Sequence, residues 1–408
     1  MKNIYFLGLA AMALGGTPNT FAQTWTQTSA PTNVWSVVAC SADGSKIYAC
    51  AGGSLLGLSQ NAITPIYTSP DGGLTWSRTA APSNYWASVV TSADGMKVAA
   101  VANNAGPLCT SSDGGLTWVT NLSPAKTWTA IACSFDGFHL YASTLQNSTL
   151  YSSANFGTTW QTQSVGWIGG LASSANGSRL AAITTTSISI STNSGRTWSV
   201  SLSANPPISI ACSADGKVLV ATADFGRIFT STNYGASWVT NNLSVPNGIG
   251  GGTWLNAAVS ADGSKIAAIG WRSSAGQYGY IYTSTNFGQT WSSNAVPVAW
   301  WSTVCSSADG NKIMAAYFLT NGPPNRGITG RIWSSQTITS PVLDQTPNNE
   351  HLTLSWLIPS TNFVLQQSSD LIGWSDVTDK LTLNLTHLQN QVTLPMSAGD
   401  SFFRLKTP

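Results

Sequence analysis

Charged residues are scarce in this sequence, and glutamate is almost absent. The 408 residues include 17 Lys and Arg and 15 Asp and Glu, and the one glutamate is Glu350. A chain poor in Glu, Lys and Arg but rich in Gly, Ser, Thr, Asn and Trp disfavours helices and favours strands joined by tight turns. A net charge of +2 argues against a nucleic-acid-binding protein. Composition therefore predicts an all-β fold, and the length favours a repetitive one.

Long apolar runs are missing beyond the N-terminus, so the sequence predicts no membrane span. The first 22 residues combine Lys2, an apolar run from Ile4 to Leu14, and a small-x-small ending at Thr20–Ala22. This pattern is typical of a secretory signal peptide. We expect cleavage near Ala22 and a secreted or periplasmic mature protein, which we also expect to be a monomer.

Cysteine and histidine are few, with six and three copies. Three of the cysteines stand at one repeated position, three residues before a turn aspartate, and equivalent sites in different repeats usually lie far apart. We interpret these three as small buried residues: Cys40, Cys133 and Cys212. The pairing of Cys50, Cys109 and Cys305 stays open. No Cys/His cluster has metal-ligand spacing, so we expect no metal and no cofactor.

A four-residue turn, Ser-Ala-Asp-Gly or a close variant, recurs seven times. Its copies are 41–44, 92–95, 134–137, 174–177, 213–216, 260–263 and 307–310. Recurrence at this period is the signature of a propeller or solenoid. Asp-Gly between apolar runs indicates hairpins, because these residues tolerate the positive φ of tight turns.

A second motif has the same period and reads Ser-x-Asp-x-Gly-x-Thr-Trp. Its copies are 69–76, 111–118, 153–160, 191–198, 231–238 and 284–291. This is the Asp-box, and residues 24–335 resemble the BNR/Asp-box family of β-propellers. In that family the box is a structural turn remote from the ligand. We assign that role to the residues at its third position: Asp71, Asp113, Asn155, Asn193, Asn233 and Asn286. Asn replaces Asp in four boxes but still caps such a turn.

Seven turns but six Asp-boxes leave one strand to be found. The last repeat ends at Arg331–Ser334 without a Thr-Trp strand, whereas Thr24-Trp25-Thr26 directly follows the predicted signal peptide. We expect this N-terminal strand to complete blade seven, with Trp25 in place of the box tryptophan, which removes open sheet edges. The predicted fold is a seven-bladed β-propeller over residues 23–340 between a signal peptide (1–22) and a C-terminal module (341–408).

The C-terminal module has no repeat. Alternating runs at 352–356, 363–367, 381–385 and 402–405 predict five or six short strands. The segment resembles the small sandwich-like β modules that end many secreted bacterial proteins. A folding or attachment role is the plain interpretation.

The acidic residues decide against a common glycosidase mechanism. Residues 23–340 contain nine acids, of which six lie in the first turn, two in Asp-boxes, and one, Asp224, in a loop. A glycoside hydrolase usually needs two carboxylates about 5–10 Å apart. Sialidases, which share the Asp-box, use an arginine triad and a Tyr–Glu pair, but no Glu precedes Glu350. The two-propeller xyloglucan-cleaving enzymes differ because only one propeller is present here. We expect no catalytic residues.

The face opposite the Asp-boxes, which we call the top, is the predicted ligand site, because variable loops surround the channel there. Five tryptophans each stand eight residues before a turn aspartate, where the first strand of a blade begins: Trp35, Trp86, Trp128, Trp254 and Trp301. They pack between blades or form stacking platforms for a ligand. We expect a mixture, with two or three exposed. Further ligand-binding candidates in the top loops are Asp224, Arg272 and Arg326.

These residues favour a secreted, non-enzymatic binding or assembly propeller that recognises a glycan or a protein surface through its top face. The seven-repeat layout also resembles the propeller of photosystem II assembly factors, which bind protein. The alternative is a secreted glycan-active hydrolase of the sialidase-like or xyloglucanase-like Asp-box type.

Overall fold

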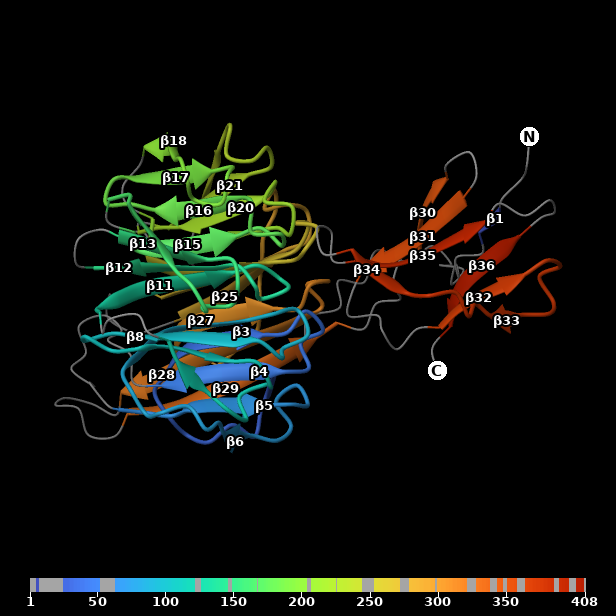
Figure 1. The fold of residues 1–408 in the computed structure, drawn as a ribbon. Helices are drawn as coiled ribbons and strands as arrows, with labels where there is room; N and C mark the ends of the chain where they lie inside the picture. The colour runs from blue at the N-terminus through green and yellow to red at the C-terminus, as the bar shows by residue number, and fades with distance from the viewer. Residues whose placement is uncertain are drawn as a thin grey trace.

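The structure is a computed structural model of residues 1–408. It describes residues 5–6, 25–51, 63–121, 126–145, 149–166, 168–203, 207–224, 226–243, 253–271, 279–297, 299–320, 328–337, 343–347, 351–357, 364–384, 389–395 and 401–406. These residues form an all-β protein (Figure 1). No helix among them is long and apolar enough to cross a membrane.

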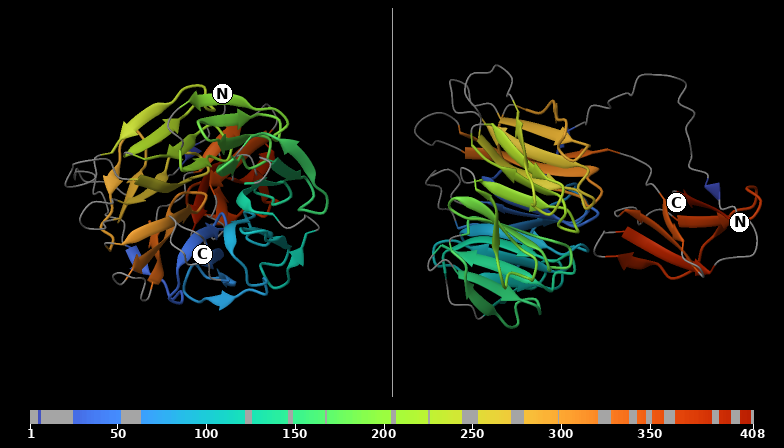
Figure 2. Two further views of the ribbon diagram at one scale, coloured as in Figure 1. Left: turned by 90° about the vertical axis from the view of Figure 1, so that its left-hand side faces the viewer. Right: turned by 90° about the horizontal axis from the view of Figure 1, so that it is seen from above.

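Seven four-stranded antiparallel sheets stand around a common axis, as the left view of Figure 2 shows. We call them blades one to seven. The strands of blades one to three, from the inside outward, are β3 (Trp35–Cys40), β4 (Ile47–Ala51), β5 (Ile66–Ser69) and β6 (Ser77–Arg78); β7 (Trp86–Thr91), β8 (Val98–Ala102), β9 (Leu108–Ser111) and β10 (Val119–Thr120); and β11 (Trp128–Cys133), β12 (Leu140–Thr144), β13 (Thr149–Ser153) and β14 (Gln161–Ser164).

Blades four to six repeat this order. Their strands are β15 (Gly170–Ser173), β16 (Leu180–Ile183), β17 (Ser187–Ser191) and β18 (Ser199–Ser203); β19 (Ser209–Cys212), β20 (Leu219–Thr222), β21 (Arg227–Ser231) and β22 (Val239–Asn242); and β23 (Thr253–Val259), β24 (Ile266–Trp271), β25 (Gly279–Ser284) and β26 (Ser292–Ser293). The second strand of each blade is rich in small and aliphatic residues, because most of its described residues are buried between neighbouring blades.

Blade seven draws its strands from both ends of the propeller sequence. It contains β27 (Trp300–Ser306), β28 (Lys312–Thr320), β29 (Ile328–Gln336) and, outermost, β2 (Trp25–Gln27). Trp25 pairs with Ser335 and Gln27 with Trp333. The Trp25 ring lies 6.3 Å from the Trp301 ring, much as the box residue Trp76 lies 6.2 Å from Trp35 in blade one.

The seven Ser-Ala-Asp-Gly turns are linked in a closed circuit by backbone hydrogen bonds of 2.6–2.8 Å. Each second turn residue donates its N–H to the carbonyl of the next, in the order Ala42, Ala93, Phe135, Ala175, Ala214, Ala261, Ala308 and back to Ala42. The seven side chains form one apolar cluster. Small residues recur at this position because seven chains converge there, which leaves room for only one larger ring, Phe135.

The Asp-box is a turn held by its own side chains. In the first copy the Ser69 hydroxyl donates to Asp71 and accepts from the Gly73 N–H, both at 2.8 Å. The Thr75 N–H donates to Asp71 Oδ1 at 2.8 Å. In the third copy Asn155 Oδ1 accepts from the Thr159 N–H at 2.9 Å, while its Nδ2 donates to the Thr159 hydroxyl. Asn and Asp therefore serve the turn equally, which explains their exchange between blades.

Residues from 343–406, together with residues 5–6, form two further four-stranded sheets (Figure 1). One is β30 (Asp344–Pro347), β31 (His351–Leu357), β35 (Gln389–Pro395) and β34 (Thr382–Asn384). The other is β1 (Tyr5–Phe6), β36 (Phe402–Lys406), β32 (Val364–Ser368) and β33 (Ser375–Asp376). They share a core of Leu352, Leu354, Trp356, Leu365, Val392, Leu394 and Phe403. The strand β1 comes from the predicted signal peptide and pairs with β36 in parallel.

A shortened relative of the Asp-box also lies in these sheets, which the sequence analysis missed. Asp370 Oδ1 accepts from the N–H groups of Ile372 and Gly373, both at 2.9 Å. The Trp374 indole donates to the carbonyl of Leu371, three residues earlier. Five of the six box tryptophans donate in the same way to the carbonyl of the glycine three residues earlier. One residue fewer separates Asp370 from its tryptophan than in the propeller, so the motif does not match by spacing.

Candidate functional site

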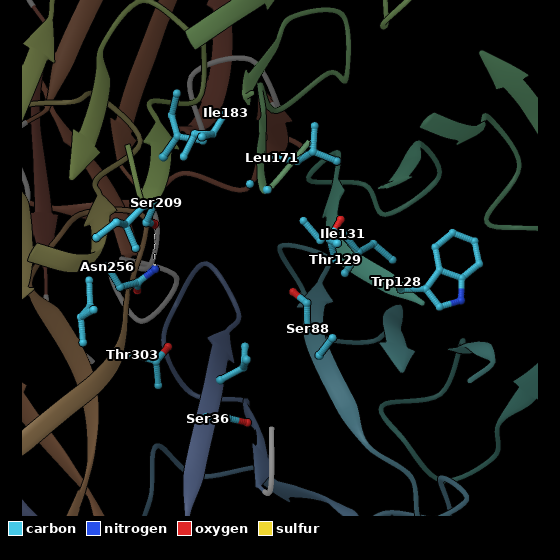
Figure 3. Close-up of a pocket in the computed structure, with 18 of the residues that line it drawn as sticks. Ser36, Ser88, Trp128, Thr129, Ile131, Leu171, Ile183, Ser209, Asn256 and Thr303 are labelled. Carbon is cyan, nitrogen blue, oxygen red and sulfur yellow. Dashed lines mark hydrogen bonds between the residues drawn. The ribbon is translucent and has the colours of Figure 1, made fainter. Parts of the chain in front are cut away.

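A pocket of about 750 Å³ opens at the channel mouth, where the innermost strands begin (Figure 3). Residues from all seven blades line it. Its polar wall residues include Ser36, Ser88, Asn103, Thr127, Thr129, Ser209, Asn256, Ser302 and Thr303, and its apolar ones include Ile131, Leu171, Ile183 and Ile210. Asp224 is the one ionisable side chain that lines it among the described residues. A pocket of this size and mixed lining lies within the usual range for ligand sites.

The five tryptophans at the strand beginnings are buried, and the prediction that two or three are exposed is wrong. Trp35, Trp86 and Trp301 have 0 % of their surface exposed, and Trp128 and Trp254 have 1 %. Four of them pack edge-to-face on a tyrosine of the same blade with ring centroids 5.2–5.3 Å apart. The indoles complete the core between blades, so their faces are not available to a ligand.

A β-bulge directly after each of these tryptophans explains this placement. The pairing register shifts between Trp35 and Val37, and equivalent shifts follow Trp86, Trp128, Trp254 and Trp301. A bulge adds one unpaired residue and re-aims the neighbouring side chains. The added residues are Ser36, Ala87, Thr129, Leu255 and Ser302, and all five line the pocket. The first strands of blades four and five lack both the tryptophan and the bulge.

Polar side chains on the pocket wall join neighbouring blades. Asn256 Nδ2 donates to the Ser209 hydroxyl at 2.9 Å (Figure 3). Its Oδ1 accepts from the Val304 N–H at 3.0 Å. This one amide therefore connects blades five, six and seven. The Ser302 hydroxyl donates to the Trp35 carbonyl in blade one at 2.8 Å. Sequence reasoning missed these residues because they do not recur at one position in every repeat.

Asp224 is the acidic candidate that the structure places in the pocket. It follows β20 in blade five, and its side chain is exposed. The described part of the chain offers it no hydrogen-bond partner. Arg272 and Arg326 lie outside the described residues. The basic residue Lys126 is held above the Tyr151 ring, with its Nζ 5.5 Å from the ring centroid, and is not part of the pocket lining.

The other eight acids of the propeller are held in turns at the opposite end. In the six first turns the aspartate Oδ1 accepts both from the preceding serine hydroxyl and from the N–H two residues on, as in Asp43 and Asp94. In the second Asp-box the Thr117 hydroxyl and N–H donate to Asp113 and lower its pKa to about 2. Within the described residues, no three His, Cys, Asp or Glu side chains gather as a metal site would require.

The fold and this pocket define a β-propeller whose described channel-mouth residues are mostly uncharged and include one carboxylate, Asp224. No protein-family model and no curated protein matches the sequence. Among solved structures, YCF48 bound to D1 peptide aligns with a TM-score of 0.53 and 17 % identity, over 79 % of this chain and 97 % of that one. YCF48 from Cyanidioschyzon merolae aligns with a TM-score of 0.55 and 14 % identity, over 76 % and 98 %.

Propellers of other types align as well. The structure of U3-55K gives a TM-score of 0.59 at 11 % identity, over 77 % of this chain and 98 % of that one. All of these identities are low, so the similarity shows the propeller fold and leaves the function to be argued from the site.

Proposed function

We propose that this protein is a non-enzymatic binding propeller that holds an extended, positively charged segment of a partner protein in its channel mouth. The observation that carries the proposal is the pocket itself: about 750 Å³, lined by hydroxyls, amides and aliphatic side chains, with Asp224 as its charged group. A carboxylate that is the one ionisable side chain among the described lining residues favours a Lys or Arg side chain or an amino terminus. YCF48, a propeller of similar fold, has been solved with a D1 peptide, which supports peptide binding by this architecture.

A protein ligand is favoured over a glycan by the position of the tryptophans. Sugars are commonly held on exposed aromatic faces, and the five indoles at the strand beginnings are 0–1 % exposed. The lining instead offers backbone and hydroxyl hydrogen-bonding groups beside aliphatic patches, a combination that suits a polypeptide.

A hydrolase of the Asp-box type is the alternative. Asp224 lines the pocket, but the usual glycosidase chemistry needs a second carboxylate about 5–10 Å away. All other acids between residues 23 and 340 belong to the turns at the far end. The proposal of a binding protein is supported by this distribution.

Peptide-array binding followed by titration calorimetry tests the proposal. We expect basic peptides to bind more tightly than acidic ones. Asp224→Asn should weaken the best binder roughly 10- to 100-fold, the range of a lost charge-assisted hydrogen bond. Asp113→Asn is the matched control, because it removes the same charge from a half-exposed position at the opposite end and should leave affinity unchanged.

Three results would contradict the proposal. One is equal loss of affinity in the two variants, and another is selective binding to a glycan array without peptide binding. The third is turnover of sialosides or xyloglucan that Asp224→Asn abolishes, which would establish the hydrolase alternative.

We further propose that the mature protein is secreted or periplasmic, and that its N-terminal strand closes the ring. The pairing of β2 with β29 supports this closure. Deletion of residues 23–30 should lower the melting temperature by about 5 °C or more, because the edge of β29 is left unpaired and Trp25 leaves the core. An unchanged melting temperature would contradict closure by this strand.

A further inference from the structure

The innermost strands bring one repeated position of each blade against its neighbour. This position lies three residues before the turn aspartate, and its side chain faces the preceding blade. In blade three it is Cys133, whose thiol donates to the Thr91 carbonyl of blade two at 3.5 Å and which packs against the same apolar cluster as Val90. In blade five it is Cys212, which shares a cluster with Ala172 of blade four. The partner position is thus four residues before the aspartate of the preceding blade.

We call the contact between the innermost strands of two neighbouring blades a seam. At the seam between blades one and seven, the repeated position and its partner position are both cysteines. Cys40 faces blade seven, where Cys305 occupies the partner position and packs against the apolar cluster that contains Trp35, Val38 and Ala49 of blade one. Two hydrogen bonds bracket the pair: the Val38 N–H to Thr303 Oγ1 at 3.3 Å, and the Ala308 N–H to the Ala42 carbonyl at 2.7 Å. The strands β3 and β27 are therefore held side by side at this point.

The other seams carry an apolar residue at the partner position. Those residues are Ala39, Val90, Ala132, Ala172, Ala211 and Ala258. Neither Cys133 nor Cys212 therefore meets a second thiol across its seam. Cys50 and Cys109 are fully buried in one cluster between blades one and two, where burial raises the pKa of each thiol.

We propose that Cys40 and Cys305 form a disulfide that joins the first blade to the last. In the structure all six cysteines are thiols, and both members of this pair are half-buried. The oxidant is a disulfide compound, such as oxidised glutathione or a dithiol–disulfide oxidoreductase. One thiolate attacks an oxidant sulfur and forms a mixed disulfide, and the second thiolate then displaces the reduced half. Two protons leave the protein, and the oxidant takes two electrons to become two thiols.

The surroundings of the pair set how this reaction proceeds. The Cys40 side chain and burial together raise the pKa of Cys305 well above its usual value. Since the thiolate is the nucleophile, oxidation of the folded protein should be slow at neutral pH and faster at alkaline pH. The bridge would close a loop containing nearly the whole propeller, and long loops gain the most from a cross-link. This inference does not depend on the proposed ligand.

Refolding of the full chain in a glutathione redox buffer at pH 8 tests the proposal. The products are alkylated under denaturing, non-reducing conditions and mapped by mass spectrometry. We expect one disulfide-linked peptide pair, containing Cys40 and Cys305, and four alkylated cysteines of the six. The oxidised protein should melt about 3–8 °C higher than the same protein treated with a reductant.

Three variants complete the test, each with a residue already used at an equivalent position. Cys40→Thr copies Thr91, and Cys305→Ala copies Ala39 and Ala172. Both should lose the difference in melting temperature between oxidised and reduced protein. Cys133→Thr, the same position in blade three, should retain it. Six alkylated cysteines in refolded native protein, a bridge between any other cysteines, or equal melting temperatures with and without the bridge would overturn the proposal.

Discussion

The two ends of the propeller differ in how strictly the sequence repeats and in what its side chains do. At the end with the turns and Asp-boxes, Ser, Asp or Asn, Gly and Thr recur at fixed spacings, and their side chains hold the turns themselves. At the channel mouth the pocket residues vary from blade to blade. Among the described residues, only blade five places an aspartate there, Asp224. The polar groups repeated in every blade therefore serve the fold. Among the unrepeated ones at the channel mouth, Asn256 joins neighbouring blades, whereas Asp224 has no hydrogen-bond partner within the described residues.

The tryptophans at the strand beginnings sharpen this comparison, because they repeat although they lie near the channel mouth. Trp35→Ala should lower the free energy of unfolding by about 3–5 kcal/mol, as removal of a large core side chain does. Chemical denaturation followed by circular dichroism measures this loss. Leu116→Ala, at an Asp-box residue that is 76 % exposed, should change it by less than about 0.5 kcal/mol. Similar small effects at both sites would contradict the burial of Trp35.

The glycines of the Asp-boxes offer a test within the repeated end. The fifth residue of the box, which is its second glycine where there are two, is Gly in all six copies. An added Cβ there would lie within about 3 Å of a neighbouring side chain, as at Gly115 beside Thr79. The fourth residue of the box varies between copies. In the third copy it is Phe156, which has a positive φ of 54°. Gly115→Ala should cost about 2–4 kcal/mol through both clash and backbone strain.

Gly114→Ala is the matched variant, because its φ is +73° but its Cβ would meet nothing closer than 3.5 Å. Backbone strain alone should cost about 1 kcal/mol. Thermal or urea unfolding of the two variants gives the difference. Equal losses would show that backbone conformation, and not space, keeps glycine at the fifth position.

The smallest expected effect is that of replacing Asp113 by Asn. The two side chains should contribute differently to stability only at acidic pH. Its folded pKa of about 2 lies below the usual value of 3.8, so its contribution to stability is present above pH 3.8 and is lost as the pH falls through 2. Asp113→Asn should leave the melting temperature at pH 7 within about 1 °C. It should also reduce the loss of melting temperature between pH 4 and pH 2. A large loss at pH 7 would show that Asn cannot replace Asp in this box.

Much of the fold could be predicted from the sequence because its signals are local. Asp-Gly turns, Asp-box spacing and alternating strands act over a few residues, and their recurrence predicted blades that the structure contains in seven copies. The role of Asn155 and its equivalents also followed from local chemistry. The relative of the Asp-box at Asp370 escaped because its spacing is one residue shorter.

The features that only the tertiary structure decided are those that depend on where a side chain points between neighbouring blades. The bulge after each tryptophan buries the indole and turns Ser36 and its equivalents to the channel, and this shift is visible only in how the strands pair. The placement of Cys40 opposite Cys305 is equally non-local, because the two positions lie in the first and the last blade and come together only where β3 packs against β27. Sequence periodicity thus determined which residues form blades, while strand register and the packing of blade against blade determined which of them face each other and which line the pocket.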